Sequence, residues 1–71
     1  MNADVTDDIT RRLALLHRLC PDMRFAQMLA TLALLGEDMT ERSLWDLDDE
    51  EFIAVIERFR QDLVLRQHVT V

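Results

Sequence analysis

The stretch that decides the fold is Met23–Leu35, which reads M-R-F-A-Q-M-L-A-T-L-A-L-L and holds ten apolar residues in thirteen. Its three polar residues, Arg24, Gln27 and Thr31, are spaced so that a helix would carry them along one narrow line. The rest of that helix is apolar, which is typical of a helix surrounded by protein on most sides. This stretch therefore predicts a helix at the centre of the molecule.

The only proline and the only glycine of the chain flank this stretch and predict where its helix begins and ends. Pro21 lacks a backbone donor and disfavours helical geometry in the residue before it. We therefore expect the helix to start just after Pro21, with Asp22 as its cap. Gly36 follows the apolar run, at a place where helices commonly end in a left-handed residue. The helix is thus expected to end near Leu35.

Amphipathic helices are predicted on both sides of the central one. The first is expected from about Asp7 to Leu19, where apolar residues recur every three to four positions. Its inward-facing residues are Ile9, Leu13, Leu16 and Cys20. The last helix is expected to follow Asp48 and Glu51, which have the spacing of a capping box. Its core-facing residues are Phe52, Ile56, Phe59 and Leu63.

The connector between the second and last helices is predicted to hold one short helix, over residues 41–46, with Leu44 and Trp45 packed down onto the core. Residues 1–6 and 67–71 are expected to fray, and no linker divides the chain. The expected fold is a single all-α domain. It is a small bundle of three main helices plus one short connecting helix, with the second helix central.

Composition narrows the possible classes of protein. The hydrophobic fraction of 49% is normal for a globular domain, and the net charge is −6. An acidic balance opposes direct binding to nucleic acid and to anionic membranes, because both require cations. The chain has no basic opening of the signal-peptide kind and no apolar run near the ~18 residues that span a bilayer. A cytoplasmic location is expected.

Residues with catalytic or metal-binding chemistry are sparse. Cys20 is the only cysteine, and His17 lies three residues before it, with no third group to orient the pair. Together with His68 they lack the spacing of a zinc site, and one glycine cannot build a phosphate-binding loop. We expect Cys20 to be a buried, inert thiol and both histidines to lie on the surface. No enzyme activity, cofactor or metal is expected.

The strongest functional feature is an acidic run. Between Glu37 and Glu51 there are eight acids and one base, Arg42. One interpretation is a solvated loop and a charged helix start; the other is a surface that docks an arginine-rich or lysine-rich partner by electrostatic steering. The spacing does not fit a calcium-binding loop. The candidate partner-binding acids are Glu37, Asp38, Glu41, Asp46, Asp48, Asp49 and Glu50.

Arg24 and Gln27, one turn apart on the polar line of the central helix, are further candidates for partner binding. The structural alternative is that Arg24 pairs with an acid near Asp48 or Asp49, since a guanidinium suits a half-buried carboxylate. Gln27 would then bond to a loop backbone.

Two segments carry a resemblance to known proteins. Residues 21–28 read P-D-M-R-F-A-Q-M, and residues 48–52 read D-D-E-E-F. Together they resemble a family of small bacterial and phage proteins with a P-D-(apolar)-R-F-G-Q-(apolar) segment followed by an acidic D-D-E before the last helix. Ala26 stands where that family usually has glycine. The resemblance implies a helical fold and implies no activity.

These features favour a small protein–protein interaction module: an adaptor, inhibitor or subunit that acts through an apolar helix face and an acidic surface. Four apolar residues lie off the main stripes: Leu15, Leu19, Val55 and Val64. Surplus apolar surface commonly marks an interface, and a homodimer is the simplest way to cover it. The alternative is an acidic nucleic-acid mimic, or antitoxin-like inhibitor, of a basic partner.

Overall fold

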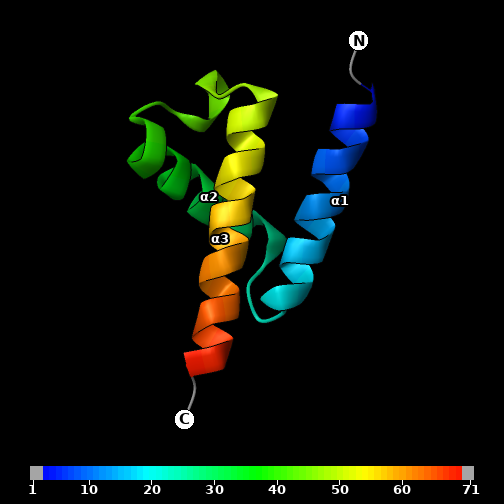
Figure 1. Ribbon diagram of the computed structural model, residues 1–71, viewed down its shortest axis with the longest axis vertical. Helices are drawn as coiled ribbons and strands as arrows, with labels where there is room; N and C mark the ends of the chain where they lie inside the picture. Colours follow the sequence, from blue (N-terminus) through cyan, green and yellow to red (C-terminus); the bar gives the residue numbers. More distant parts are fainter. Residues whose placement is uncertain (1–2, 70–71) are drawn as a thin grey trace.

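The computed structural model describes residues 3–69, and within them the chain forms three α-helices and one short 3-10 turn, with no strand (Figure 1). The helices are α1 (Ala3–Leu19), α2 (Phe25–Thr40) and α3 (Asp49–Val69), and the 3-10 turn η1 (Leu44–Asp46) lies between α2 and α3. The predicted all-α bundle of three main helices and one short connecting helix is confirmed.

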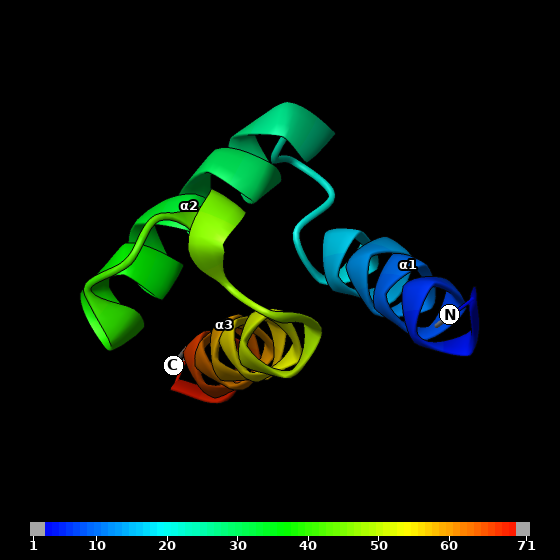
Figure 2. The same cartoon turned by 90° about the horizontal axis from the view of Figure 1, so that it is seen from above.

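The helix at the centre of the bundle is α3 and not α2. Both α1 and α2 pack mainly against α3, and Figure 2 shows them on different sides of it. Two adjacent residues of α3 contact the two other helices. Val55 lies against Gly36 of α2, and Ile56 lines a groove with Leu16 of α1. Val55, which the sequence places off the main stripe, is therefore fully buried.

Only one face of α2 is covered, so the prediction of a helix surrounded by protein was wrong. The buried residues of α2 are Met28, Leu32 and Gly36. On the opposite face Ala26, Ala30 and Leu34 are exposed, Leu34 at 70%. Apolar residues extend around much of the circumference of α2. In a chain of this length, the other two helices cannot cover all of them.

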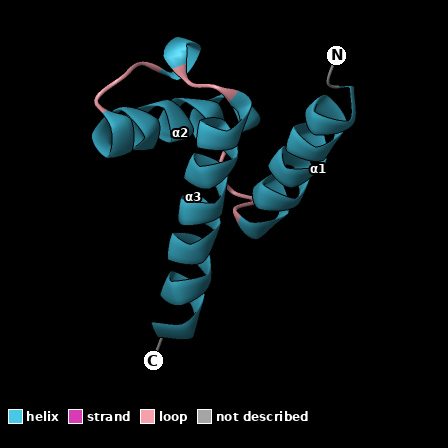
Figure 3. Ribbon diagram, turned by 45° about the horizontal axis from the view of Figure 1, so that its top comes forward, coloured by secondary structure: helices cyan, strands magenta, loops and turns pink. Residues whose placement is uncertain are grey.

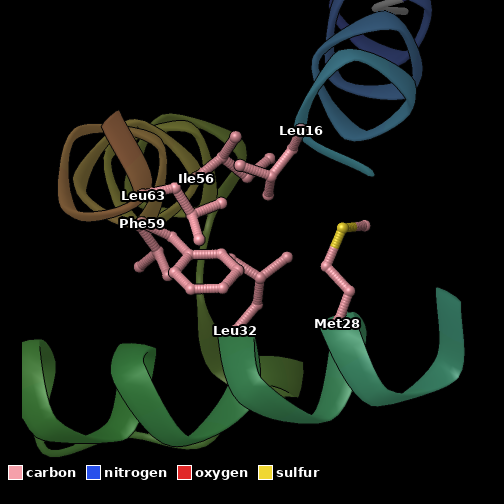
Figure 4. Packing of buried hydrophobic residues seen from close by; sticks show 7 residues of the cluster. Leu16, Met28, Leu32, Ile56, Phe59 and Leu63 are labelled. Carbon is pink, nitrogen blue, oxygen red and sulfur yellow. The ribbon is translucent and has the colours of Figure 1, made fainter. Parts of the chain in front are cut away.

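The core lies where the three helices meet, with one buried residue of α1 facing several of α2 and α3 (Figure 4). Its members are Leu16, Met28, Leu32, Val55, Ile56, Phe59 and Leu63. The predicted stripes of the first and last helices supply Leu16, Ile56, Phe59 and Leu63, as expected. The other stripe residues, among them Leu13 and Phe52, are partly buried and pack around this cluster.

Gly36 does not end α2, contrary to the prediction. The helix continues to Thr40, and Glu41 adopts the left-handed conformation (φ 61°) that closes it, with its N–H donating to the carbonyl of Glu37 at 2.7 Å. A Cβ atom added at Gly36 would lie 3.2 Å from Cδ1 of Leu47 and 3.6 Å from Cγ2 of Val55. The missing side chain is thus used for close packing rather than for a turn.

α2 also begins later than predicted. Residues 20–23 form a turn in which the N–H of Met23 donates to the carbonyl of Cys20 at 3.0 Å. The helix then begins at Phe25, and Arg24, not Asp22, occupies the capping position. The side chain of His17 closes this turn by donating from Nε2 to the carbonyl of Met23 at 2.7 Å.

Both ends of the described chain are more helical than expected. α1 begins at Ala3, one turn before the predicted start, and α3 runs to Val69, so residues 3–6 and 67–69 are helical although fraying was predicted. The remaining residues predicted to fray, 1–2 and 70–71, lie outside the described residues. Between residues 3 and 69, none of the helices has both the length and the apolar character needed to cross a bilayer.

Candidate functional site

The connection between α2 and α3, residues 41–48, gathers the acidic run at one end of the molecule (Figure 3). It joins the last turn of α2 to the first turn of α3, so acids from both helices and from the loop lie at the same end. All seven predicted acids are exposed. We call this surface the acidic end; its members are Glu37, Asp38, Glu41, Asp46, Asp48, Asp49 and Glu50.

The start of α3 is held by the predicted capping box. The N–H of Glu51 donates to Oδ1 of Asp48 at 2.8 Å, and the N–H of Asp48 donates to Oε1 of Glu51 at 3.0 Å. These bonds satisfy two backbone donors that a helix N-terminus would otherwise leave free. Asp48 therefore has a structural role besides its place in the acidic end.

The single base of the acidic run is used internally. Arg42 forms an ion pair with Glu51, and its Nη1 also donates to the carbonyl of Asp46 at 3.4 Å. In the described part of the chain, the ion pairs include none of the seven acids of the acidic end. Their charge is therefore available to a cation from outside the molecule.

Two features of the acidic end are locally unfavourable. Glu37 and Asp38 lie near the C-terminal end of α2, where the helix dipole favours positive charge and no basic residue is present. Glu41 is the one non-glycine residue with positive φ among the described residues. A left-handed backbone costs a residue with a Cβ roughly 1 kcal/mol relative to glycine. These positions of the carboxylates therefore lower the stability of the folded chain.

Trp45 is the largest exposed residue of this end, and the prediction that it packs onto the core was wrong. Its side chain is 90% exposed. Residues three apart lie on the same side of a 3-10 turn, so Leu44 and Leu47 both turn inward and are half-buried, while Trp45 points away. The spacing L-W-D-L carries this information once the turn is known to be 3-10 rather than α-helical.

The loop that carries Trp45 is closed by its own hydrogen bonds. The N–H of Asp46 donates to the carbonyl of Ser43 at 2.9 Å, and Oγ of Ser43 donates to Oδ2 of Asp46 at 3.1 Å. The N–H of Leu47 donates to the carbonyl of Leu44 at 3.3 Å. Trp45 is therefore exposed on an ordered turn whose neighbouring leucines are anchored.

Arg24 and Gln27 lie at the other end of α2, so the structure does not bring them into the acidic end. Oε1 of Gln27 accepts a hydrogen bond from the N–H of Arg24 at 2.9 Å, which caps the helix. The 16 residues of α2 span about 24 Å between this cap and the acids. The predicted pairing of Arg24 with Asp48 or Asp49 was therefore wrong.

The side chains of His17 and Cys20 both make contacts within the fold. His17, predicted on the surface, is half-buried: besides its bond to Met23 it packs edge-on against Phe25, with ring centroids 5.5 Å apart. The thiol of Cys20 is half-buried and lies 3.5 Å from the carbonyl of Leu16, and burial raises its pKa. A raised pKa keeps the thiol neutral and unreactive. Among the described residues, no three potential ligands gather to hold a metal.

Comparison with known proteins gives no match, whether with protein-family models, curated proteins or solved structures. The resemblance carried by residues 21–28 and 48–52 therefore stays a prediction. The candidate site is accordingly defined by its own geometry: seven exposed carboxylates and an exposed tryptophan at the same end of the molecule.

Proposed function

We propose that the chain is a small protein-binding module whose acidic end captures an arginine-rich or lysine-rich segment of a partner protein, with Trp45 as the anchor. The observation that carries this proposal is the 90% exposure of Trp45 on an ordered turn among seven exposed carboxylates. Tryptophan is among the residues that most often dominate binding energy at protein interfaces.

The charge distribution supports a basic partner. Residues 37–51 carry a net charge of −7, against −6 for the whole chain, which leaves the remainder of the chain near neutral. Such a concentrated charge steers a cationic partner toward one end of the molecule and speeds association. An arginine or lysine placed over the indole of Trp45 would add a cation–π contact, worth about 0.5–2 kcal/mol.

The local costs of the acidic end also support the proposal. A stable monomer would gain from glycine at position 41 and from basic residues in the last turn of α2, yet the chain carries acids at these places. Backbone strain of this kind is concentrated at functional sites. We interpret these acids as kept for binding rather than for folding.

The proposal is tested by the binding of a fluorescent nona-arginine peptide, measured by anisotropy at low and physiological salt. The triple variant Glu37→Gln, Asp38→Asn, Glu50→Gln leaves the capping residues Asp48 and Glu51 intact. It should weaken binding about tenfold, or 1.4 kcal/mol. Its matched control removes three exposed acids elsewhere and should change affinity less than about threefold. The control substitutions are Asp4→Asn, Asp7→Asn and Asp22→Asn.

Trp45→Ala decides between the proposal and the nucleic-acid-mimic alternative. A tryptophan-anchored module loses about fivefold in affinity when the indole is removed, as a cation–π contact of about 1 kcal/mol requires. A mimic binds through charge alone and keeps its affinity in this variant while losing it in the acidic triple variant. Equal losses in the acidic triple variant and its control would overturn both.

A further inference from the structure

One side of α2 faces away from both α1 and α3 (Figure 2) and carries a shallow, mostly apolar hollow. The hollow is lined by Asp22, Met23, Gln27, Ala30 and Thr31. Leu34, which is 70% exposed, follows Gln27 by about two helical turns, or about 10 Å. The exposed leucine and the hollow therefore lie on the same side of the same helix. We call this side the outer face of α2.

The hollow has the form that receives a side chain from a facing helix. In knobs-into-holes packing, a side chain of one helix inserts between residues on two successive turns of its neighbour. Gln27, Ala30 and Thr31 have this spacing. Ala30 is small, so it lets the facing helix approach closely. A leucine that projects from another helix would fill the hollow.

The outer face of α2 is complementary in shape to itself. A twofold axis midway between Gln27 and Leu34 passes beside Ala30 and Thr31. It places Leu34 of each copy in the hollow of the other, with the two α2 helices antiparallel. A twofold contact requires one surface to carry both the projecting group and the space that receives it. The outer face meets this requirement.

The charges at the two ends of α2 favour the same antiparallel arrangement. Residues 25–36 carry no charge, and the charged residues that flank them are Asp22, Arg24, Glu37 and Asp38. The twofold axis places Arg24 of one copy opposite positions 37 and 38 of the other. Among the described residues, no ion pair includes Arg24. Asp22 offsets part of this attraction, but a parallel pairing would bring four carboxylates together and provide no opposing cation.

We infer that the chain forms a twofold symmetric dimer through the outer faces of α2. Leu34 of each copy occupies the hollow beside Gln27 of the other, and Arg24 faces Asp38. The contact uses only Glu37 and Asp38 of the acidic end, so its other five acids and Trp45 stay available to a basic partner. The dimer does not depend on the function proposed for that end.

Sedimentation equilibrium tests the dimer. One helix from each copy makes a small interface, so we expect a dissociation constant on the order of 10 µM. At about 200 µM the native chain should sediment with nearly twice the mass of one chain, and at about 1 µM it should be monomeric. Free energies of unfolding measured at about 1 µM therefore belong to the single chain.

A substitution at Leu34 tests the contact itself. Leu34→Glu should be monomeric at about 200 µM, because it would bury an unpaired carboxylate in the hollow near Asp22 of the other copy. Leu65→Glu is the matched control. Leu65 is also a largely exposed leucine, at 60%, but it lies on α3. This control should dimerise like the native chain.

A charge reversal tests the antiparallel arrangement. Arg24→Glu should weaken dimerisation about tenfold, because it replaces the one cation at each end of the contact by an anion. Adding Asp38→Arg to this variant should restore most of the lost affinity. Arg11→Glu makes the same change in net charge on α1 and should alter the affinity less than about threefold.

Three results together support the inference: a monomeric Leu34→Glu with native circular dichroism, a dimeric Leu65→Glu, and rescue of Arg24→Glu by Asp38→Arg. A native chain that is monomeric at about 200 µM overturns it. A dimer that survives Leu34→Glu, or that Leu65→Glu weakens equally, also overturns it. Failure of Asp38→Arg to restore the affinity overturns it as well, because antiparallel α2 helices require that rescue.

Discussion

The connection between α1 and α2 and the connection between α2 and α3 are both short, yet they differ in where their side chains point. In the first, the imidazole of His17 turns inward, bonds to the carbonyl of Met23 and packs against the ring of Phe25. In the second, the indole of Trp45 turns outward to 90% exposure and every acid of the loop is exposed. The first connection uses its aromatic group to close the chain; the second presents one to solvent.

The comparison teaches that the two connections are stabilised by different means. The first has a backbone bond across its turn, from the N–H of Met23 to the carbonyl of Cys20, and is closed by the side chain of His17, which belongs to the preceding helix. The second is held by backbone bonds in η1, by the capping box of Asp48 and Glu51, and by Leu47 packed close to Gly36. Apart from Arg42 and Asp48, the exposed residues of the second connection can therefore change without removing this support, which is what a binding surface requires.

The largest expected effect comes from filling the space that receives Leu47. Gly36→Leu would place a side chain against Leu47 and Val55, and overpacking of this kind costs about 1–3 kcal/mol. Ala30→Leu, on the exposed face of the same helix, should change the free energy of unfolding by less than about 0.5 kcal/mol. Urea unfolding followed by circular dichroism measures both. Equal stability of the two variants would show that the second connection does not depend on the close approach at Gly36.

A pair of substitutions compares the two aromatic groups directly. His17→Ala removes the bond to Met23 and the contact with Phe25, which should cost about 1–2 kcal/mol because a half-buried carbonyl loses its donor. Trp45→Ala removes a larger side chain but should change the free energy of unfolding by less than about 0.5 kcal/mol. The reverse order of effects would mean that Trp45 packs on the protein in solution and would remove the basis for its proposed role.

The sequence carries enough information for the first and last helices and for the gathering of the acids. The spacing of Asp48 and Glu51 is local, and a capping box depends on little else, so it was predicted correctly. The acids gather because a short connection between antiparallel or crossing helices must bring their adjoining ends together. Glu37 and Asp49 therefore lie at one end of the bundle whatever the packing angle.

The remaining features depend on tertiary contacts that a pattern does not contain. Gly36 lacks a Cβ, and the same property serves a left-handed helix end or a close helix contact; only the position of Leu47 decides between them. Leu34 is apolar at helical spacing, yet no helix covers it. The wrong prediction for Trp45 has another cause. The direction in which its side chain points follows from the 3-10 periodicity of η1, which differs from the periodicity of an α-helix.

The smallest expected effect belongs to the first connection and appears at alkaline pH. Burial raises the pKa of the Cys20 thiol in the folded chain, so the folded state holds this proton more tightly than the unfolded state. The stabilisation is complete below the ordinary thiol pKa of about 8.5 and is lost as pH rises through the folded-state value. The chain has no lysine and no tyrosine, the other side chains whose ordinary pKa values lie in this range.

The free energy of unfolding of the native chain should therefore fall above about pH 8.5, whereas that of Cys20→Ala should stay nearly level between pH 9 and about 11. The second connection contains no cysteine, lysine or tyrosine, the side chains whose ordinary pKa values lie in this range. A decline of equal size in both chains would show that Cys20 is as accessible in the folded state as in the unfolded one. In that case the structure that His17 closes would not protect Cys20 from solvent. The two connections would then differ only in their aromatic groups.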